Sequence, residues 1–185
     1  MPVSLAATAA PTRGSLVPIG SSVISGTSTN SVTFQNIPQN LQDLMVIIYT
    51  GSAASGAAMS CWLQYNGDGT SNYSATFLYG NGSSALSTRR GNTVQEIGNI
   101  DSGIVFGTNL FASIQVHILN YANTSTFKTT LSRYSMDRNG SGETNLVAGL
   151  YRSTSAISTL RVGTGNQNFA SGSTISLYGV RTVGQ

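Results

Sequence analysis

Charged residues, cysteine and histidine are scarce in this chain of 185 residues. Charged residues make up 8% of the sequence, against about a quarter in typical soluble domains. The single cysteine, Cys61, excludes an intrachain disulfide and every metal site that needs several cysteines. Stability must therefore come from packing or from assembly. The surface must consist mainly of neutral Ser, Thr, Asn, Gln and Gly, as suits a protein that packs against other subunits or binds glycans.

The positive charge is spread along the chain, and no long apolar run is present. Nine Lys and Arg residues give a net charge of +3, yet only Arg89 and Arg90 are adjacent. Nucleic-acid-binding domains show a dense basic stripe, so we expect no nucleic acid as a partner. No apolar run approaches the roughly 20 residues needed to cross a membrane, and residues 1–11 lack the features of a secretory signal. We expect a protein made in the cytoplasm, without a membrane partner.

Apolar residues recur with a period of two along most of the chain, in short segments separated by Gly, Ser, Asn and Asp. This alternation is typical of strands, and the turn sequences at 66–69, 80–82 and 139–142 tolerate the positive φ of hairpins. The continuous apolar run over 44–49 predicts a strand covered on both faces, at a sheet centre or an interface. The pattern predicts eleven strands: 16–24, 32–37, 44–51, 59–65, 75–79, 94–100, 110–121, 126–134, 145–151, 157–162 and 174–180.

Eleven short strands with few helix signals predict an all-β sandwich, jelly roll or barrel. The chain is too short for two comfortable domains, so residues 15–185 are expected to form one. Residues 1–14 differ, because they are rich in Ala and Thr, contain Pro2 and Pro11, and show no alternation. We interpret them as an extended N-terminal arm outside the core.

The sequence offers little of what common hydrolytic sites need, which is a nucleophile, a base and an orienting group within reach of one another. His117 lies within a predicted strand among polar neighbours, which favours a surface or interface role over catalysis or metal binding. Cys61 alternates with Met59 and Leu63 on an apolar face, as a buried, inert thiol would. We therefore predict no catalytic residue, no metal, no cofactor and no enzyme activity.

Three other features have both a structural and a functional interpretation. The NGDGT sequence at 66–70 resembles a calcium loop but lacks its further acids, which favours a plain turn. Trp62 is either a partly exposed anchor or a core residue of a second sheet, and the core position is slightly favoured. No two acids are close enough in sequence to indicate the paired carboxylates of a glycosidase, although the fold could bring two together. The acids are Asp43, Asp68, Glu96, Asp101, Asp137 and Glu143.

Short strand and turn phrases run through almost the whole chain, from about residue 16 to residue 183: VTFQNIP (32–38) with DL (43–44), NGD (66–68) with NY (72–73), GNGSS (80–84), NY (120–121), FKT (127–129), RSTSAI (152–157) and LYG (177–179). Together they resemble a jelly-roll domain found in virion structural proteins of tailed bacteriophages, both in head decoration (cement) proteins and in tail-fibre segments. The phrases contain no catalytic signature, so no functional residue is transferred.

The resemblance implies a non-enzymatic virion protein with a jelly-roll-like antiparallel β-sandwich, homotrimeric and assembled in the host cytoplasm. The chain lacks a fibre's long shaft, so we expect a decoration protein that binds neighbouring major capsid subunits, with the arm at 1–14 pairing with a partner. The alternative is a tail-fibre or other tail-associated module that binds a receptor or host-surface glycan. A flat apolar base would favour decoration, whereas exposed aromatics beside Asp or Asn in a groove would favour glycan binding.

Overall fold

The computed structural model describes residues 16–26, 29–54, 58–100, 111–137 and 140–181. The predicted arm at 1–14, Asp101, and Asn139 of one predicted turn lie outside the described residues. Among the residues that are described, no helix is long and apolar enough to span a membrane. They form the strands β1 (Leu16–Val23), β2 (Ser31–Phe34), β3 (Asp43–Thr50), β4 (Met59–Tyr65), β5 (Tyr73–Gly80), β6 (Ala85–Asn92), β7 (Gln95–Ile100), β8 (Ala112–Leu119), β9 (Lys128–Asp137), β10 (Gly142–Tyr151), β11 (Leu160–Gly165) and β12 (Thr174–Val180).

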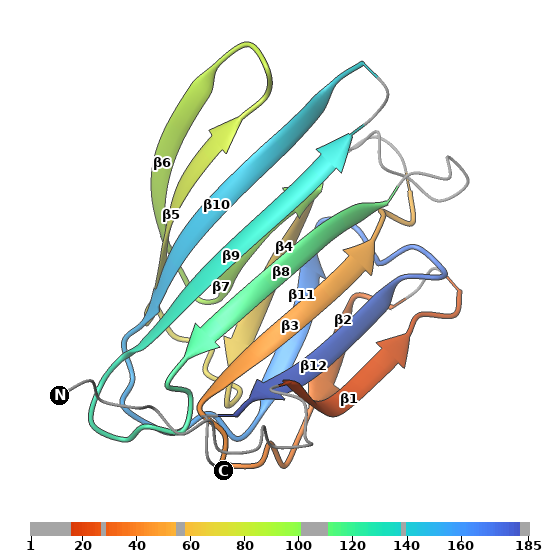
Figure 1. Ribbon diagram of the computed structural model, residues 1–185. Coiled ribbons are helices and arrows are strands. Elements are labelled where there is room, and N and C mark those ends of the chain that lie inside the picture. Colours follow the sequence, from red (N-terminus) through yellow and green to blue (C-terminus); the bar gives the residue numbers. More distant parts are fainter. Residues whose placement is uncertain (1–15, 27–28, 55–57, 101–110, 138–139, 182–185) are drawn as a thin grey trace, which may run out of the picture.

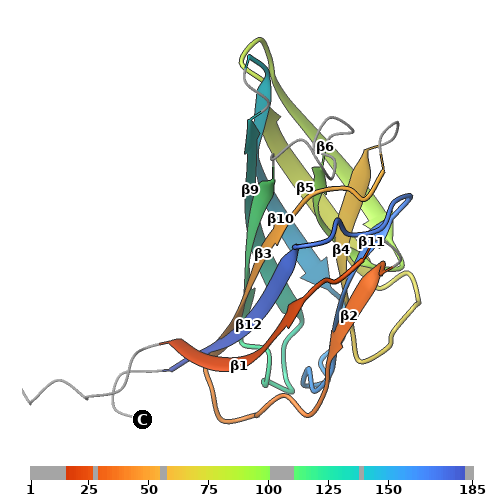
Figure 2. The ribbon, with the colours of Figure 1, turned by 90° about the vertical axis from the view of Figure 1, so that its right-hand side faces the viewer.

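These strands form two antiparallel sheets that face each other as two layers (Figures 1 and 2). The larger sheet has the order β1-β12-β3-β8-β9-β10-β5-β6, and the smaller has the order β2-β11-β4-β7. Four antiparallel pairs are nested in the chain: β1 with β12, β2 with β11, β3 with β8, and β4 with β7. Successive pairs alternate between the sheets, which is the winding of a jelly roll. The predicted all-β, jelly-roll-like antiparallel sandwich is confirmed.

Two further hairpins widen the larger sheet beyond the jelly-roll strands. β5 and β6 follow β4 in the chain, and β9 and β10 follow β8. β10 pairs with β5, so the two hairpins join and add four strands to one edge of the sheet (Figure 1). This extension gives the larger sheet a broad outer face, which carries the surfaces described below.

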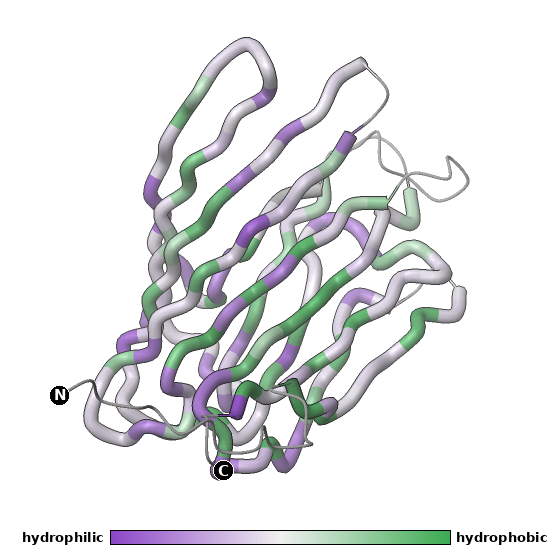
Figure 3. The backbone as a smooth tube through the Cα atoms, in the orientation of Figure 1, coloured by the Kyte–Doolittle hydropathy of each residue, from purple (hydrophilic) through white to green (hydrophobic). Residues whose placement is uncertain are grey.

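The core lies between the sheets because apolar residues alternate with polar ones along the strands (Figure 3). In β8, Ile114, Val116 and Ile118 are buried, whereas Gln115 and His117 are directed to the outer face. Fully burying one such aliphatic side chain stabilises the fold by about 2 kcal/mol. The two-residue period therefore fixes both the fold and which side chains reach the surface.

Two strand predictions need correction. β3 lies inside the larger sheet, between β12 and β8, but it is not covered on both faces. Its inner residues, such as Val46 and Ile48, are buried, whereas Tyr49 is 48% exposed. β6 was not predicted at all, because most of its side chains are exposed on both faces and leave no alternation to detect.

Candidate functional site

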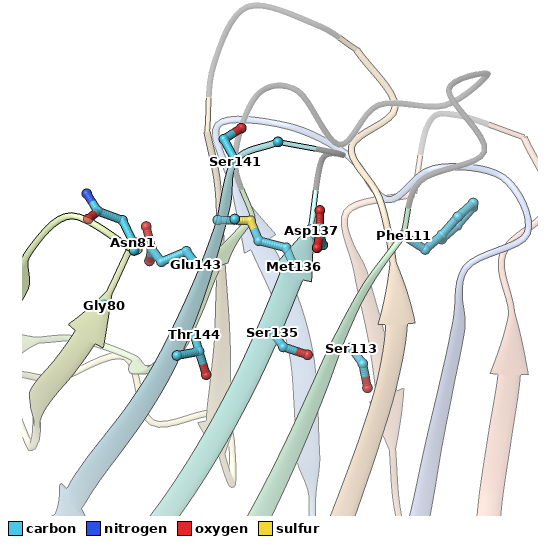
Figure 4. Close-up of a pocket in the computed structure, with 13 residues that line it drawn as sticks. Gly80, Asn81, Phe111, Ser113, Ser135, Met136, Asp137, Ser141, Glu143 and Thr144 are labelled. Atoms are coloured by element: carbon cyan, nitrogen blue, oxygen red, sulfur yellow. The ribbon is translucent and has the colours of Figure 1, made fainter.

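A shallow, open cleft of about 780 Å³ lies at the end of the larger sheet, beside the connection between β9 and β10 (Figure 4). Side chains from three adjacent strands and from the turn between β5 and β6 form its walls. The lining consists of Gly80, Asn81, Gly82, Phe111, Ser113, Ser135, Met136, Asp137, Gly140, Ser141, Gly142, Glu143 and Thr144.

A row of hydroxyl groups forms part of this lining. Ser113 of β8 pairs with Ser135 of β9, and Ser135 pairs with Thr144 of β10. All three lie on the outer face, where directly opposed residues have Cβ atoms about 5 Å apart. Tyr49 of β3 continues the row beyond Ser113, and Gly80 of β5 ends it beyond Thr144. The row of hydroxyl groups therefore lies between Tyr49, which does not itself line the cleft, and Gly80, which has no side chain.

An aromatic pair and one acid lie near this row on the outer face. The Tyr49 ring stacks on Phe111, with centroids 4.8 Å apart and an interplanar angle of 13°. Asp137 is exposed on the outer face at the end of β9 (Figure 4), whereas Glu143 precedes the outward-facing Thr144 and directs its carboxylate to the inner face. Glu143 Oε1 accepts a hydrogen bond of 2.6 Å from the hydroxyl of Tyr134. The fold thus brings Asp137 and Glu143 to the same end of the larger sheet but on opposite faces, so it does not pair these two acids.

His117 lies at the surface of the larger sheet, as predicted. Its Nε2 is 3.0 Å from Asp43 Oδ2, and Asp43 Oδ1 accepts a hydrogen bond of 2.7 Å from the backbone N–H of Asn120. The residues opposite His117 in the neighbouring strands are Met45 and Leu131. The carboxylate thus links His117 to the β8–β9 connection, and both flanking strands present apolar side chains.

Cys61 and Trp62 are adjacent in β4 and face opposite sides of the smaller sheet. Cys61 is fully buried, as predicted, and burial raises the pKa of its thiol to about 12, which disfavours the reactive thiolate. Trp62 is half-buried on the outer face, so the favoured core position was wrong. It packs over Gly163, where a Cβ would lie 2.3 Å from the indole ring, and Arg161 lies 5.3 Å from the ring centroid.

The sequence at 66–70 forms a turn, and the carboxylate of Asp68 in this turn accepts hydrogen bonds from other residues of the chain. Asn66 and Gly67 have φ values of 52° and 70°, as a tight turn with two left-handed residues requires. The turn joins β4 of the smaller sheet to β5 of the larger sheet, so it is not the predicted hairpin. Asp68 Oδ1 accepts hydrogen bonds from the N–H and hydroxyl of Thr70, and Oδ2 accepts from Asn72 and Tyr151. Within the described part of the chain, no group of three or more His, Cys, Asp or Glu side chains could hold a metal ion.

These hydrogen bonds predict an acid-sensitive contribution of Asp68 to stability. The bonds from Thr70 and then Asn72 lower the pKa of Asp68 from 3.8 to about 2. The carboxylate should stabilise the fold above about pH 4, and this contribution should disappear as the pH falls towards 2. Urea unfolding at several pH values should show a smaller loss of stability between pH 4 and 2 for Asp68→Asn than for the native chain. An unchanged pH profile would contradict this role.

Comparison of the chain with protein-family models, curated proteins and solved structures finds no match. The resemblance to virion jelly rolls therefore stays a prediction, and the function has to be inferred from the surfaces of this molecule.

Proposed function

We propose that this chain is a non-enzymatic structural subunit that assembles through the outer face of its larger sheet. One observation supports the proposal: this face exposes large apolar side chains on neighbouring strands. Leu78, Leu131 and Leu146 are 56%, 46% and 44% exposed. Leu146 pairs directly with Leu78 on one side and with Arg133 on the other, and Leu131 lies two residues from Arg133 on the same face of β9. We call Met45, Ile47, Leu78, Leu131 and Leu146 the apolar strip.

The polar side chains next to the apolar strip have partners within the chain. Arg133 Nε donates a hydrogen bond of 2.9 Å to Gln115 Oε1, and His117 pairs with Asp43. A partner that covers the strip therefore does not have to supply a new acceptor for every polar group that it buries. Contiguous exposed apolar surface is characteristic of protein–protein contacts. The strip is thus suited to association.

A partly apolar sheet face fits the decoration role. In this proposal, a homotrimer sits on the head of a virion and binds neighbouring major capsid subunits, which stabilises the particle. The alternative, a tail-associated module that binds a receptor or glycan, is favoured by a different observation, the open cleft whose lining includes Phe111 and Asp137. That cleft lies at the end of the same sheet, beyond the apolar strip.

The oligomeric state tests this proposal. Light scattering of the native chain at micromolar concentration should give a multiple of 19.2 kDa, with three copies expected. The double variant Leu131→Glu/Leu146→Glu should give a monomer, because burying two carboxylates in the interface is costly even beside Arg133. Phe127→Glu changes an equally exposed apolar residue outside the sheet and should leave the mass unchanged. A monomeric native chain, or a double variant with the native oligomer mass, would contradict assembly through the strip.

A further inference from the structure

We propose that Asn81, in the turn between β5 and β6, is a site of spontaneous deamidation, whereas Asn66, which also precedes a glycine, is protected. In this reaction the backbone nitrogen of the following residue attacks Cγ of the asparagine. The proton of that nitrogen leaves with Nδ2 as ammonia, and a cyclic succinimide forms. Water then opens the ring to aspartate or isoaspartate, so a neutral turn gains a carboxylate. This inference does not depend on the assembly proposed above.

Steric access does not distinguish the two sites. A glycine follows each asparagine, and it has no side chain that would block the approach of its nitrogen. A Cβ on Gly67 or on Gly82 would meet no atom beyond its chain neighbours within 4 Å. Asn66 and Asn81 are both exposed. The hydrogen bonds of the two side chains therefore decide which one reacts. Asn139 precedes a third glycine and lies outside the described residues.

The Asn66 amide is held at both its nitrogen and its oxygen by the connection between β10 and β11. Its Nδ2 donates a hydrogen bond of 2.8 Å to the backbone carbonyl of Ala156. Its Oδ1 accepts from the backbone N–H groups of Ser158 and Thr159, at 2.9 and 3.1 Å. Cγ cannot turn towards the nitrogen of Gly67, and Nδ2 cannot leave, until these bonds are broken. Their loss adds to the barrier for ring closure.

The Asn81 amide is bound within its own turn. Its Oδ1 accepts from the backbone N–H groups of Ser83 and Ser84, at 3.0 and 2.9 Å. Bonds to residues two and three positions ahead fold the side chain over the peptide nitrogen between them, that of Gly82, which is the nucleophile. The same two N–H groups stabilise the negative charge that develops on Oδ1 during the attack, as the donors of an oxyanion hole do. The turn therefore favours ring closure at Asn81.

Deamidation would change both the charge and the backbone at this end of the larger sheet. Asn81 lines the open cleft together with Asp137 (Figure 4), so the product places a second carboxylate there. Isoaspartate also routes the main chain through its side-chain carbon and lengthens the turn by one atom. This turn joins Gly80 and Ala85, which form the last pair of the β5–β6 ladder. The hairpin should therefore loosen at its tip as the protein ages.

Peptide mapping by mass spectrometry measures both sites in one sample, because chymotrypsin cuts between them at Tyr73 and Tyr79. The native chain is incubated at mildly alkaline pH, and the deamidated fraction of each peptide is followed with time. Asn81 should react at least about tenfold faster than Asn66, since only the Asn66 amide must first leave its partners in another connection. Aspartate and isoaspartate peptides should both appear at Asn81.

The chain unfolded in guanidinium chloride gives the reference rates, because it keeps both sequences and removes the hydrogen bonds. Asn66 should react at least about tenfold faster there than in the native chain, whereas Asn81 should react no faster. Asn81→Gln should abolish the modification of this turn and leave the rate at Asn66 unchanged, which assigns the signal. Equal rates at Asn66 and Asn81 in the native chain, or a faster reaction of Asn81 after unfolding, would overturn the proposal.

Discussion

Replacing Tyr73 with Ala should lower the free energy of unfolding by about 3–5 kcal/mol, the cost of truncating a large core aromatic. Tyr73 is fully buried. Its ring stacks on Tyr151 with centroids 4.7 Å apart and lies 5.9 Å from the Tyr65 ring. Its hydroxyl donates to the carbonyl oxygen of Asp68 and accepts from the backbone N–H of Tyr65. The substitution thus opens a cavity and removes the link between core and turn.

Two further variants separate the contribution of ring packing to stability from that of the hydrogen bonds of the Tyr73 hydroxyl. Tyr73→Phe keeps the ring but leaves the N–H of Tyr65 and the carbonyl of Asp68 without this partner, which should cost about 1–3 kcal/mol. Tyr49→Ala removes a tyrosine that is half exposed and should cost much less than Tyr73→Ala. Urea unfolding followed by circular dichroism measures all three. If Tyr73→Ala were no more destabilising than Tyr49→Ala, the aromatic cluster would not be an important part of the core.

Much of the fold could be predicted from the sequence, because one physical rule produces most of it. β4 and β12 have the bounds that the alternation predicted, since each has one face in the core and one outside. The rule fails where a strand has no buried face. β6 contains Arg89, Arg90 and Gly91, and most of its side chains are exposed. Its pairing with β5 therefore cannot be predicted from the hydropathy pattern.

The candidate site was harder to predict, because it depends on the register in which neighbouring strands pair. Ser113, Ser135 and Thr144 are common residue types, and nothing in the sequence shows that three particular ones become neighbours. Only the pairing of β8, β9 and β10 determines this row. One signal was present: Asp137 and Glu143 flank the predicted turn at 139–142, so a hairpin there brings both acids to the same end of the sheet.

The most unexpected residue in the core is Lys128, because lysine is rarely buried without an acidic partner. Its ammonium group donates three hydrogen bonds to backbone carbonyls, at 2.5 Å to Asn123, 2.9 Å to Thr126 and 3.1 Å to Thr154. Asn123 and Thr126 belong to the connection between β8 and β9, and Thr154 belongs to the connection between β10 and β11. Burial lowers the pKa of this ammonium, because removal from water disfavours the charge. Lys128 therefore fastens two connections together.

Lys128→Met should lower the free energy of unfolding by about 2–4 kcal/mol, because three carbonyl oxygens lose a charged donor. Methionine has a similar length, and it removes the cost of burying an ammonium. This gain offsets part of the stability lost with the hydrogen bonds, so the expected loss does not exceed about 4 kcal/mol. The matched control is Arg152→Met, since Arg152 is an exposed cation in the same connection as Thr154 and also donates to a backbone carbonyl, that of Ser71. It should cost less than about 1 kcal/mol, because water can replace an exposed donor. Urea unfolding of the two variants beside the native chain gives the comparison. If Lys128→Met were no more destabilising than Arg152→Met, the buried ammonium would not be what holds the two connections together.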